Sequence, residues 1–232
     1  MRSLITFLLT VTVIYGTLVE STTITCNFGN SENFKYASEP TLYNCHLSIP
    51  FEDFHTIDSA TVEHLSGKTN DDVQGLIINS ISNLGNFPKN IEKVFKNLIA
   101  IEIFACDLTE IHGDDLKVFP QLKYLSLDYN KLKTLSANTF ASNPNLEVLI
   151  LNNNEIYHVD RQAFAGLNKL RVLIAHLNTC FSLYKAENAV EVKNMIKKIE
   201  NGDCENPENK KSAFDSDQEW NVDDVMKLFQ TG

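Results

Sequence analysis

Apolar positions along this chain follow one pattern that returns every 24 residues. In each copy an apolar residue is followed by others three, five and ten positions later, with asparagine or cysteine eight positions after the first. The copies are Leu98-Ile101-Ile103-Cys106-Leu108, Leu122-Leu125-Leu127-Asn130-Leu132, Leu146-Leu149-Leu151-Asn154-Ile156, and Leu170-Leu173-Ala175-Asn178, where Cys180 replaces the last apolar residue. The alternation at the centre of each copy predicts a short strand, and the fixed period predicts that these strands stack side by side.

This spacing is the signature of a leucine-rich repeat. We therefore predict the α/β class, as a leucine-rich-repeat solenoid with a curved parallel sheet, a convex side of irregular or short helical segments, and a disulfide-linked cap at each end. A weaker copy begins at Val73, for which we expect Ser82 or Asn83 to take the asparagine slot. In the regular copies the asparagine should bond to backbone groups of the turn after the strand, because buried turn groups need partners.

The N-terminal region has patterns of its own. Arg2 precedes an apolar run over residues 4–19, which is shorter than the about 20 residues of a membrane-spanning helix. Residues 1–21 are therefore expected to be a cleaved secretory signal peptide. Apolar and polar residues then alternate around Cys26 and around Cys45, which predicts two strands in an N-terminal cap over residues 22–72.

The chain changes again after the repeats, which we place at residues 73–179. Val192, Ile196 and Ile199 stand at helical spacing, which predicts a helix in a C-terminal cap over residues 180–204. Residues 205–232 are polar and acidic. We expect this tail to be solvated, and a short amphipathic helix that docks a partner is the alternative.

The repeats sort the five cysteines of the chain. In an oxidising compartment cysteines tend to pair. Cys26 and Cys45 precede the first repeat, while Cys180 and Cys204 lie at or after the end of the last one, so we predict the disulfides Cys26–Cys45 and Cys180–Cys204. Cys106 occupies an internal asparagine slot and should be a free, buried thiol.

The formal net charge is −10, from 20 basic and 30 acidic residues. This excess of acid argues against nucleic acid and anionic membranes as partners. The sequence contains no zinc-binding motif, no nucleophile elbow and no glycine-rich phosphate loop. We therefore expect no enzyme activity, no metal and no cofactor.

At the level of families, residues 26–204 resemble the secreted leucine-rich-repeat proteins of insects, particularly those of flies and mosquitoes. The resemblance is carried by Cys26 and Cys45, the 24-residue repeats through Asn130 and Asn154, and the ending Asn178-Thr179-Cys180 with the later Cys204. It implies an extracellular protein–protein interaction module. Some members act in immune recognition, and those usually add a coiled-coil tail that this sequence does not show.

A ligand is expected on the concave side of the predicted sheet. The candidate residues there are Phe104, Tyr124, Ser126, Asp128, Tyr129, Val148, Ile150, Asn152, Ile174 and His176. Aromatic and apolar side chains among polar ones on an exposed face are typical of a protein interface. Alternatively, the β-branched residues stand here for their strand propensity, or a cap covers part of the face.

The sequence thus predicts a secreted, extracellular protein that binds another protein through its concave sheet, with extracellular recognition or immunity as the expected process. Two alternatives belong to other classes. One is a structural matrix protein that associates with itself as a homo-oligomer. The other is a non-catalytic subunit of a secreted enzyme.

Overall fold

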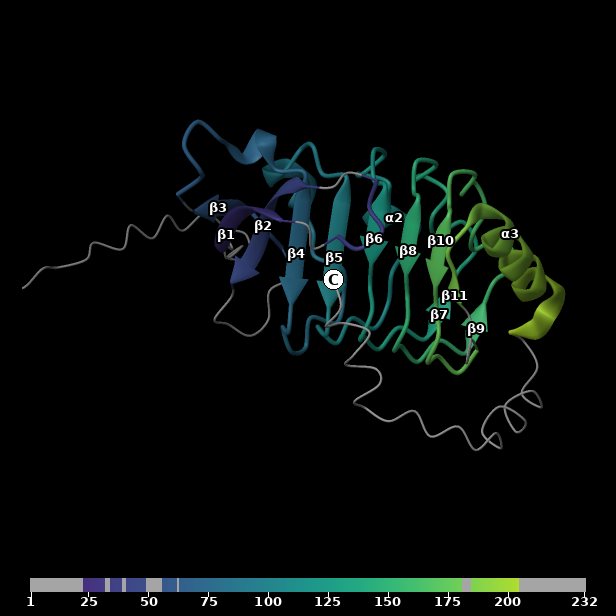
Figure 1. Cartoon of the computed structure of the whole chain (residues 1–232). Coiled ribbons are helices and arrows are strands. Elements are labelled where there is room, and N and C mark those ends of the chain that lie inside the picture. Colours follow the sequence, from purple (N-terminus) through teal and green to yellow (C-terminus); the bar gives the residue numbers. More distant parts are fainter. Residues whose placement is uncertain are drawn as a thin grey trace, which may run out of the picture.

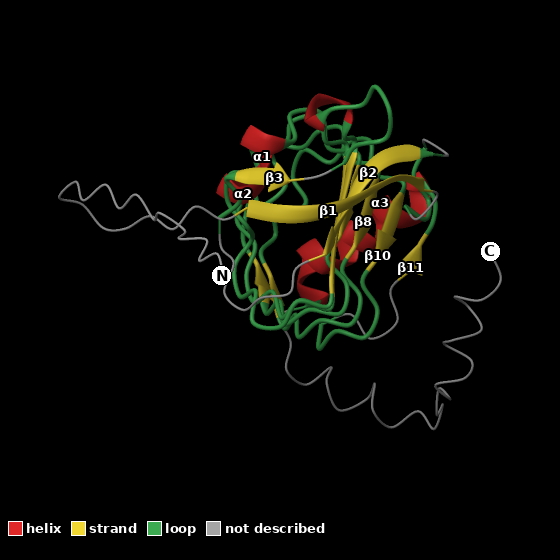
Figure 2. Ribbon diagram, turned by 90° about the vertical axis from the view of Figure 1, so that its left-hand side faces the viewer, coloured by secondary structure: helices red, strands yellow, loops and turns green. Residues whose placement is uncertain are grey.

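The computed structural model describes residues 23–31, 34–38, 41–48, 56–61, 63–180 and 185–204. These residues form a solenoid with a long sheet on one side and loops with short helices on the other (Figures 1 and 2). The predicted leucine-rich-repeat architecture is therefore confirmed. The predicted signal peptide, residues 1–21, and the acidic tail, residues 205–232, lie outside the described residues.

One nine-stranded sheet runs the length of the described part, in the order β11-β10-β8-β6-β5-β4-β2-β1-β3. From β2 to β10 neighbouring strands are parallel, whereas β1 and β11 run antiparallel to their inner neighbours, and β3 pairs in parallel with β1. The bounds are β1 (Thr23–Ser31), β2 (Leu42–Ser48), β3 (Ser59–Thr61), β4 (Gly75–Asn79), β5 (Ala100–Phe104), β6 (Tyr124–Ser126), β8 (Val148–Ile150), β10 (Val172–Ile174) and β11 (Lys185–Ala186). As the alternation around the two cysteines predicts, β1 and β2 form a hairpin.

The convex side is built from short segments. They are the 3₁₀ turn η1 (Asn70–Asp72), the helices α1 (Ile91–Val94) and α2 (Gly113–Leu116), and the paired strands β7 (Thr134–Leu135) and β9 (His158–Val159). At the C-terminal end of the stack, α3 (Ala189–Lys198) continues into a π-helical turn, η2 (Ile199–Asp203), where the sequence predicts a helix. The Asn188 side chain caps α3 by accepting from the backbone N–H groups of Val190 and Glu191.

Asparagine side chains hold the turn after each strand, as predicted. Asn154 Nδ2 donates to the carbonyl oxygens of Leu127 at 2.8 Å and Leu151 at 3.0 Å, and its Oδ1 accepts from a backbone N–H of the preceding repeat. Asn130 and Asn178 make the equivalent bonds in their own repeats. Each amide therefore joins two turns, so neighbouring repeats depend on one another.

Cysteine and isoleucine replace asparagine in the first two repeats. Cys106 is free and buried, as predicted, and burial raises the pKa of its thiol to about 11. In the preceding repeat, the prediction that Ser82 or Asn83 takes the asparagine slot is wrong. Ile78 pairs with Ile103, so the buried Ile81 stands opposite Cys106. These two strands are offset by 25 residues (Gly75 pairs with Ala100), and a count of 24 misses the slot by one.

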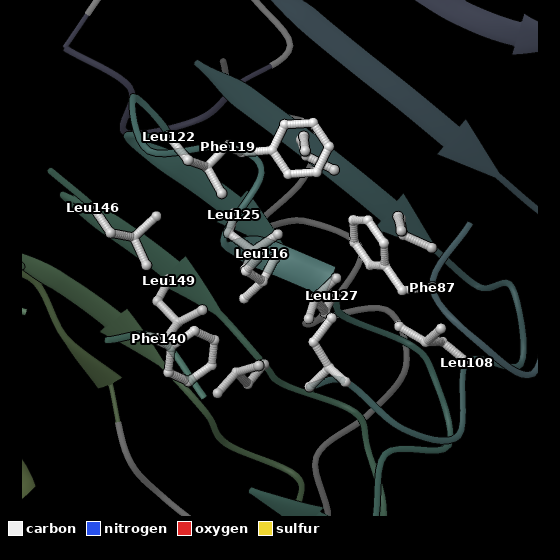
Figure 3. Close-up of a cluster of buried hydrophobic side chains, with 14 of the residues drawn as sticks. Phe87, Leu108, Leu116, Phe119, Leu122, Leu125, Leu127, Phe140, Leu146 and Leu149 are labelled. Atoms are coloured by element: carbon white, nitrogen blue, oxygen red, sulfur yellow. The ribbon is translucent and has the colours of Figure 1, made fainter. Parts of the chain in front are cut away.

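The core lies inside the solenoid, between the sheet and the convex segments. Figure 3 shows inward-pointing leucines of the strands meeting aromatic side chains that return from the convex side. Phe140 and Phe164 occupy one slot in successive repeats, are both buried, and stack with ring centroids 6.1 Å apart. No single repeat could bury these faces alone, so the core exists only as the stack.

Both predicted disulfides are present. Cys26–Cys45 joins β1 to β2, and Cys180–Cys204 joins the end of the last repeat to the residue after η2. In the described part of the chain, none of the helices has the length and apolar character needed to cross a bilayer.

Candidate functional site

Outward-facing side chains of the central strands line up in columns, because their parallel partners stand 24 residues apart. A side chain in a column therefore has the equivalent residue of the next repeat as its neighbour. The first column is Gly75, Ala100, Tyr124, Val148 and Val172. The second is Ile77, Glu102, Ser126, Ile150 and Ile174, and the third is Asn79, Phe104, Asp128, Asn152 and His176.

Most of the first two columns is covered. We predicted that these positions face solvent, and for six of the candidate residues that is wrong: Tyr124, Ser126, Val148, Ile150, Asn152 and Ile174 are buried. Residues 34–38, which we call the strap, belong to the connection between β1 and β2, and Phe34 shares an apolar cluster with Tyr124 and Val148. The N-terminal cap thus covers part of the concave face, which was one of the two alternatives to an exposed face (Figure 1).

The ring of Phe34 anchors one end of the strap to the sheet. Phe34 packs edge-on against Tyr124, with ring centroids 5.3 Å apart. The same ring lies directly over Gly75, where an added Cβ would stand 2.5 Å from it. Glycine is required at this position because any side chain would push the ring off the sheet.

The other end of the strap is tied to the last repeats by polar contacts. The Arg171 guanidinium donates to the backbone oxygen of Tyr36 and, at 3.2 Å, to the Ser38 hydroxyl. Ser38 donates to Glu147, which also pairs with Arg171 at 3.3 Å. The strap therefore spans the sheet from β4 to β10.

The uncovered part is a strip along the C-terminal ends of the strands. We call it the open strip and define it as Phe104, Asp128, Tyr129, Asn153, His176 and Leu177. Tyr129 is 37% exposed and Leu177 is 52% exposed. The rings of Phe104 and Tyr129 contact one another, with centroids 5.0 Å apart. Of the predicted binding residues, Phe104, Asp128, Tyr129 and His176 therefore remain accessible and lie along one strip.

Two bulky residues of the open strip adopt a left-handed backbone. Tyr129 has a φ of 55° and Leu177 a φ of 54°, as does the equivalent Asn153 at 53°. Asparagine tolerates this conformation, whereas in a larger residue it costs on the order of 1–3 kcal/mol. Tyr129 and Leu177 therefore expose apolar surface at positions where asparagine would adopt the left-handed backbone at lower cost.

Two carboxylates give this face its electrostatic character. Burial, and after it the charge of Asp128, raises the pKa of Glu102 to about 7. Burial also raises the pKa of Asp128, although the Ser126 hydroxyl opposes that change by donating to its carboxylate at 2.6 Å. For His176, burial and then the charge of Lys185 lower the pKa. Burial thus makes both carboxyl groups hold their protons more tightly than they would in water, and the histidine on the far side of β8 is disposed to be neutral.

Asp128 and His176 are the carboxylate and the imidazole of the open strip. Within the described residues, no group of three or more His, Cys, Asp and Glu side chains is placed to hold a metal ion. Asp128 and His176 share a column but stand two repeats apart, with Asn152 between them. The arrangement presents aromatic, apolar and acidic groups side by side, which is the composition of a protein interface.

Sequence reasoning put Glu102 and Leu177 on the concave face but left both out of the candidate binding residues. It allowed for a cap over part of that face without identifying the strap. Glu102 stands among the apolar second column, where a carboxylate is unusual. Gly75 could have indicated the strap, because a glycine in a column of larger residues signals a close approach by another segment. Nothing in the sequence indicates which segment that is.

Comparison with known proteins identifies the leucine-rich repeat in part of the chain. Residues 120–178 match the leucine rich repeat family model. No curated protein sequence matches the chain significantly. One similar solved structure is a complex of TLR13 with ssRNA13, at 22% identity and a TM-score of 0.40, covering 56% of this chain and 18% of that one.

Two others are structures of the Toll–Spatzle complex, described as a molecular hub in Drosophila development and innate immunity. The glycosylated form is 18% identical with a TM-score of 0.41 and covers 53% of this chain and 19% of its own. The other is 16% identical with a TM-score of 0.43 and covers 60% and 22%. The present chain therefore spans about a fifth of the length of these structures.

Proposed function

We propose that this chain is a protein-binding module that recognises a protein ligand through the open strip. The observation that carries the proposal is the pair Tyr129 and Leu177, two exposed apolar side chains held in a left-handed backbone. Folding alone favours asparagine in that slot, as at Asn153. Because this backbone strain does not help the fold, it supports a role of the two side chains in contacts with a ligand.

The chemistry of the strip favours a protein over a small ligand. Phe104 and Tyr129 supply an aromatic anchor, and aromatic residues dominate binding energy in protein interfaces. Asp128, Asn153 and His176 place polar groups beside that anchor, as at the rim of an interface.

The proposal is tested with two matched tyrosines. Tyr129 and Tyr157 are both exposed, at 37% and 49%, but Tyr157 precedes β9 and lies off the open strip. Immobilised wild type, Tyr129→Ala and Tyr157→Ala proteins are incubated with extracellular fluid of the animal that expresses the chain. We expect a partner that wild type and Tyr157→Ala retain and Tyr129→Ala loses.

Equal retention by all three proteins would contradict the proposal. Self-association would appear in the same experiment as capture of the chain's own copies, together with a mass in solution that grows with concentration.

Secretion and the insect-type class are part of the same proposal. The two disulfides support an oxidising, extracellular destination, because such bonds rarely persist in the cytosol. We expect secretory cells to release the protein with its N-terminus at Thr22, which mass spectrometry of the medium would show. Retention of the chain inside the cells would contradict secretion.

A further inference from the structure

Among the described residues, two carboxylates on the concave face have no positively charged partner. Glu102 on β5 pairs in register with Ser126 on β6, so Asp128, two residues further along, is its diagonal neighbour on the same face. Neither carboxylate takes part in an ion pair with a described residue. The Asp128 carboxylate accepts from the Ser126 hydroxyl, whereas the Glu102 carboxylate accepts no hydrogen bond from the described residues. Negative charge here is left for a group from outside to compensate.

A neutral acceptor lies beside Glu102 on the other neighbouring strand. Asn79 on β4 pairs in register with Phe104, which places it one strand from Glu102 on the same face. Its side-chain oxygen is buried and has no hydrogen-bond partner among the described residues. A buried acceptor without a donor costs about 1–3 kcal/mol, so turning this amide toward a donor supplied by a ligand would be favourable.

Aromatic rings flank the carboxylates. Phe104 follows Glu102 by two residues on the same strand face, and Tyr129 directly follows Asp128. Their rings lie 5.0 Å apart and are tilted to one another by 50°. Aromatic faces attract cations, and arginine stacks on them as well as pairing with carboxylates.

We propose that Glu102, Asp128 and Asn79, together with the Phe104–Tyr129 pair, form an acceptor cluster that takes an arginine side chain of the protein partner. The inference rests on the proposed function and deepens it by assigning the chemistry of the ligand. Arginine fits because its planar guanidinium presents five donors, enough for two carboxylates and an amide oxygen, and keeps a face free to stack. Lysine has three donors on one atom and no plane, so it serves this acceptor set less well.

The acceptor cluster predicts a particular pH dependence of arginine binding. With the pKa of Glu102 at about 7, about a tenth of this group is ionised at pH 6 and about nine tenths at pH 8. The affinity for arginine should therefore rise about tenfold over that interval, and Asp128 titrates in the same direction. The groups that face Glu102 from the neighbouring strands are Ser126, Tyr124 and Asp128, then Asn79, and, on the far side of Ile77, His46 on β2.

The test uses a defined probe and the full chain. The peptide acetyl-Gly-Arg-Gly-amide is titrated into ¹⁵N-labelled protein at pH 8, beside a twin with citrulline, which has the same shape without the charge, and a twin with lysine. We expect saturable shifts at the amides of Glu102, Phe104, Asp128 and Tyr129. Binding should be at least tenfold weaker for citrulline and clearly weaker for lysine.

Variants localise the effect. Glu102→Gln and Asp128→Asn should each weaken arginine binding at least tenfold, while Glu155→Gln, an exposed carboxylate in the turn after Asn154, should leave it unchanged. Well-dispersed spectra of all three variants establish that they fold. Shifts spread over the surface, equal binding of citrulline or lysine, or shifts produced by calcium chloride and not by arginine would overturn the assignment.

Failure of this test is separable from failure of the proposed function. Capture of the partner depends on Tyr129 and is read without any peptide. If the partner is lost with Tyr129→Ala but retained by Glu102→Gln, the open strip stands as the binding surface. The assignment of an arginine side chain to the acceptor cluster would then be wrong.

Discussion

Replacing Glu102 with glutamine should stabilise the protein above neutral pH and leave its stability unchanged in acid. The pKa of this carboxyl is raised from 4.5 to about 7, chiefly by burial and next by the charge of Asp128. A raised carboxyl pKa means that the folded state holds the proton more tightly than the unfolded state. The contribution of Glu102 to stability is therefore fully present below about pH 4.5 and is lost as the pH rises to about 7. Above that pH the stability of the protein stays reduced.

The size of the effect follows from the same two values. The difference between 4.5 and about 7 corresponds to about 3 kcal/mol in the free energy of unfolding, at about 1.4 kcal/mol for each pH unit. Glutamine resembles the protonated carboxyl in size and lacks the charge. Glu102→Gln should therefore match wild type at pH 4 and exceed it by about 3 kcal/mol at pH 8.

Urea unfolding of wild type, Glu102→Gln and Glu155→Gln at a series of pH values measures this directly. Comparison with the variant isolates Glu102, because every other titrating group is common to both proteins. Glu155 is exposed, and its replacement serves as the control for exchanging a glutamate for glutamine. Parallel curves for wild type and Glu102→Gln, or a variant less stable at pH 8, would refute the reasoning and indicate that the Glu102 carboxylate has a partner in the folded state.

Four further substitutions test other parts of the structure. Asn154→Ala leaves buried turn groups unpaired and should lower the free energy of unfolding in urea by about 1–3 kcal/mol. A loss below about 0.5 kcal/mol would contradict the role of the asparagine side chains in holding the turns. Leu177→Asn should raise stability by up to about 1 kcal/mol while Asn153→Leu lowers it, because both sites need a left-handed backbone; changes of equal sign would show that strain is not the cause. Gly75→Val should drive Phe34 off the sheet and release the strap, so trypsin should cleave after Lys35 faster than in wild type, and an unchanged rate would contradict the seating of the strap.

The repeat was predictable from sequence because each of its features is local and periodic. The strands, the asparagine turns and the free thiol of Cys106 all occupy fixed slots of one pattern. The disulfides followed from that pattern, since it placed two cysteines before the repeats and two at their end. The slot at Ile81 was missed because the first interval is one residue longer than the others.

The strap was not predictable, because its contacts join residues far apart in the chain. Ser38 reaches Glu147, 109 residues away, and nothing in either neighbourhood indicates the other. The burial of Tyr124 and Val148 depends on this segment, so periodicity could assign them to the concave face but could not tell that the face is covered. Exposure of a sheet face is a property of what packs on it rather than of the strand sequence.

Site-specific photo-crosslinking tests the central claim most directly. A benzophenone amino acid is placed at residue 129 in one protein and at residue 157 in another, and each is irradiated with the captured partner. Binding through the open strip predicts a covalent adduct with the partner from position 129 and none from position 157. Adducts from position 157 alone, or equally from both, would contradict the assignment of the open strip as the binding surface.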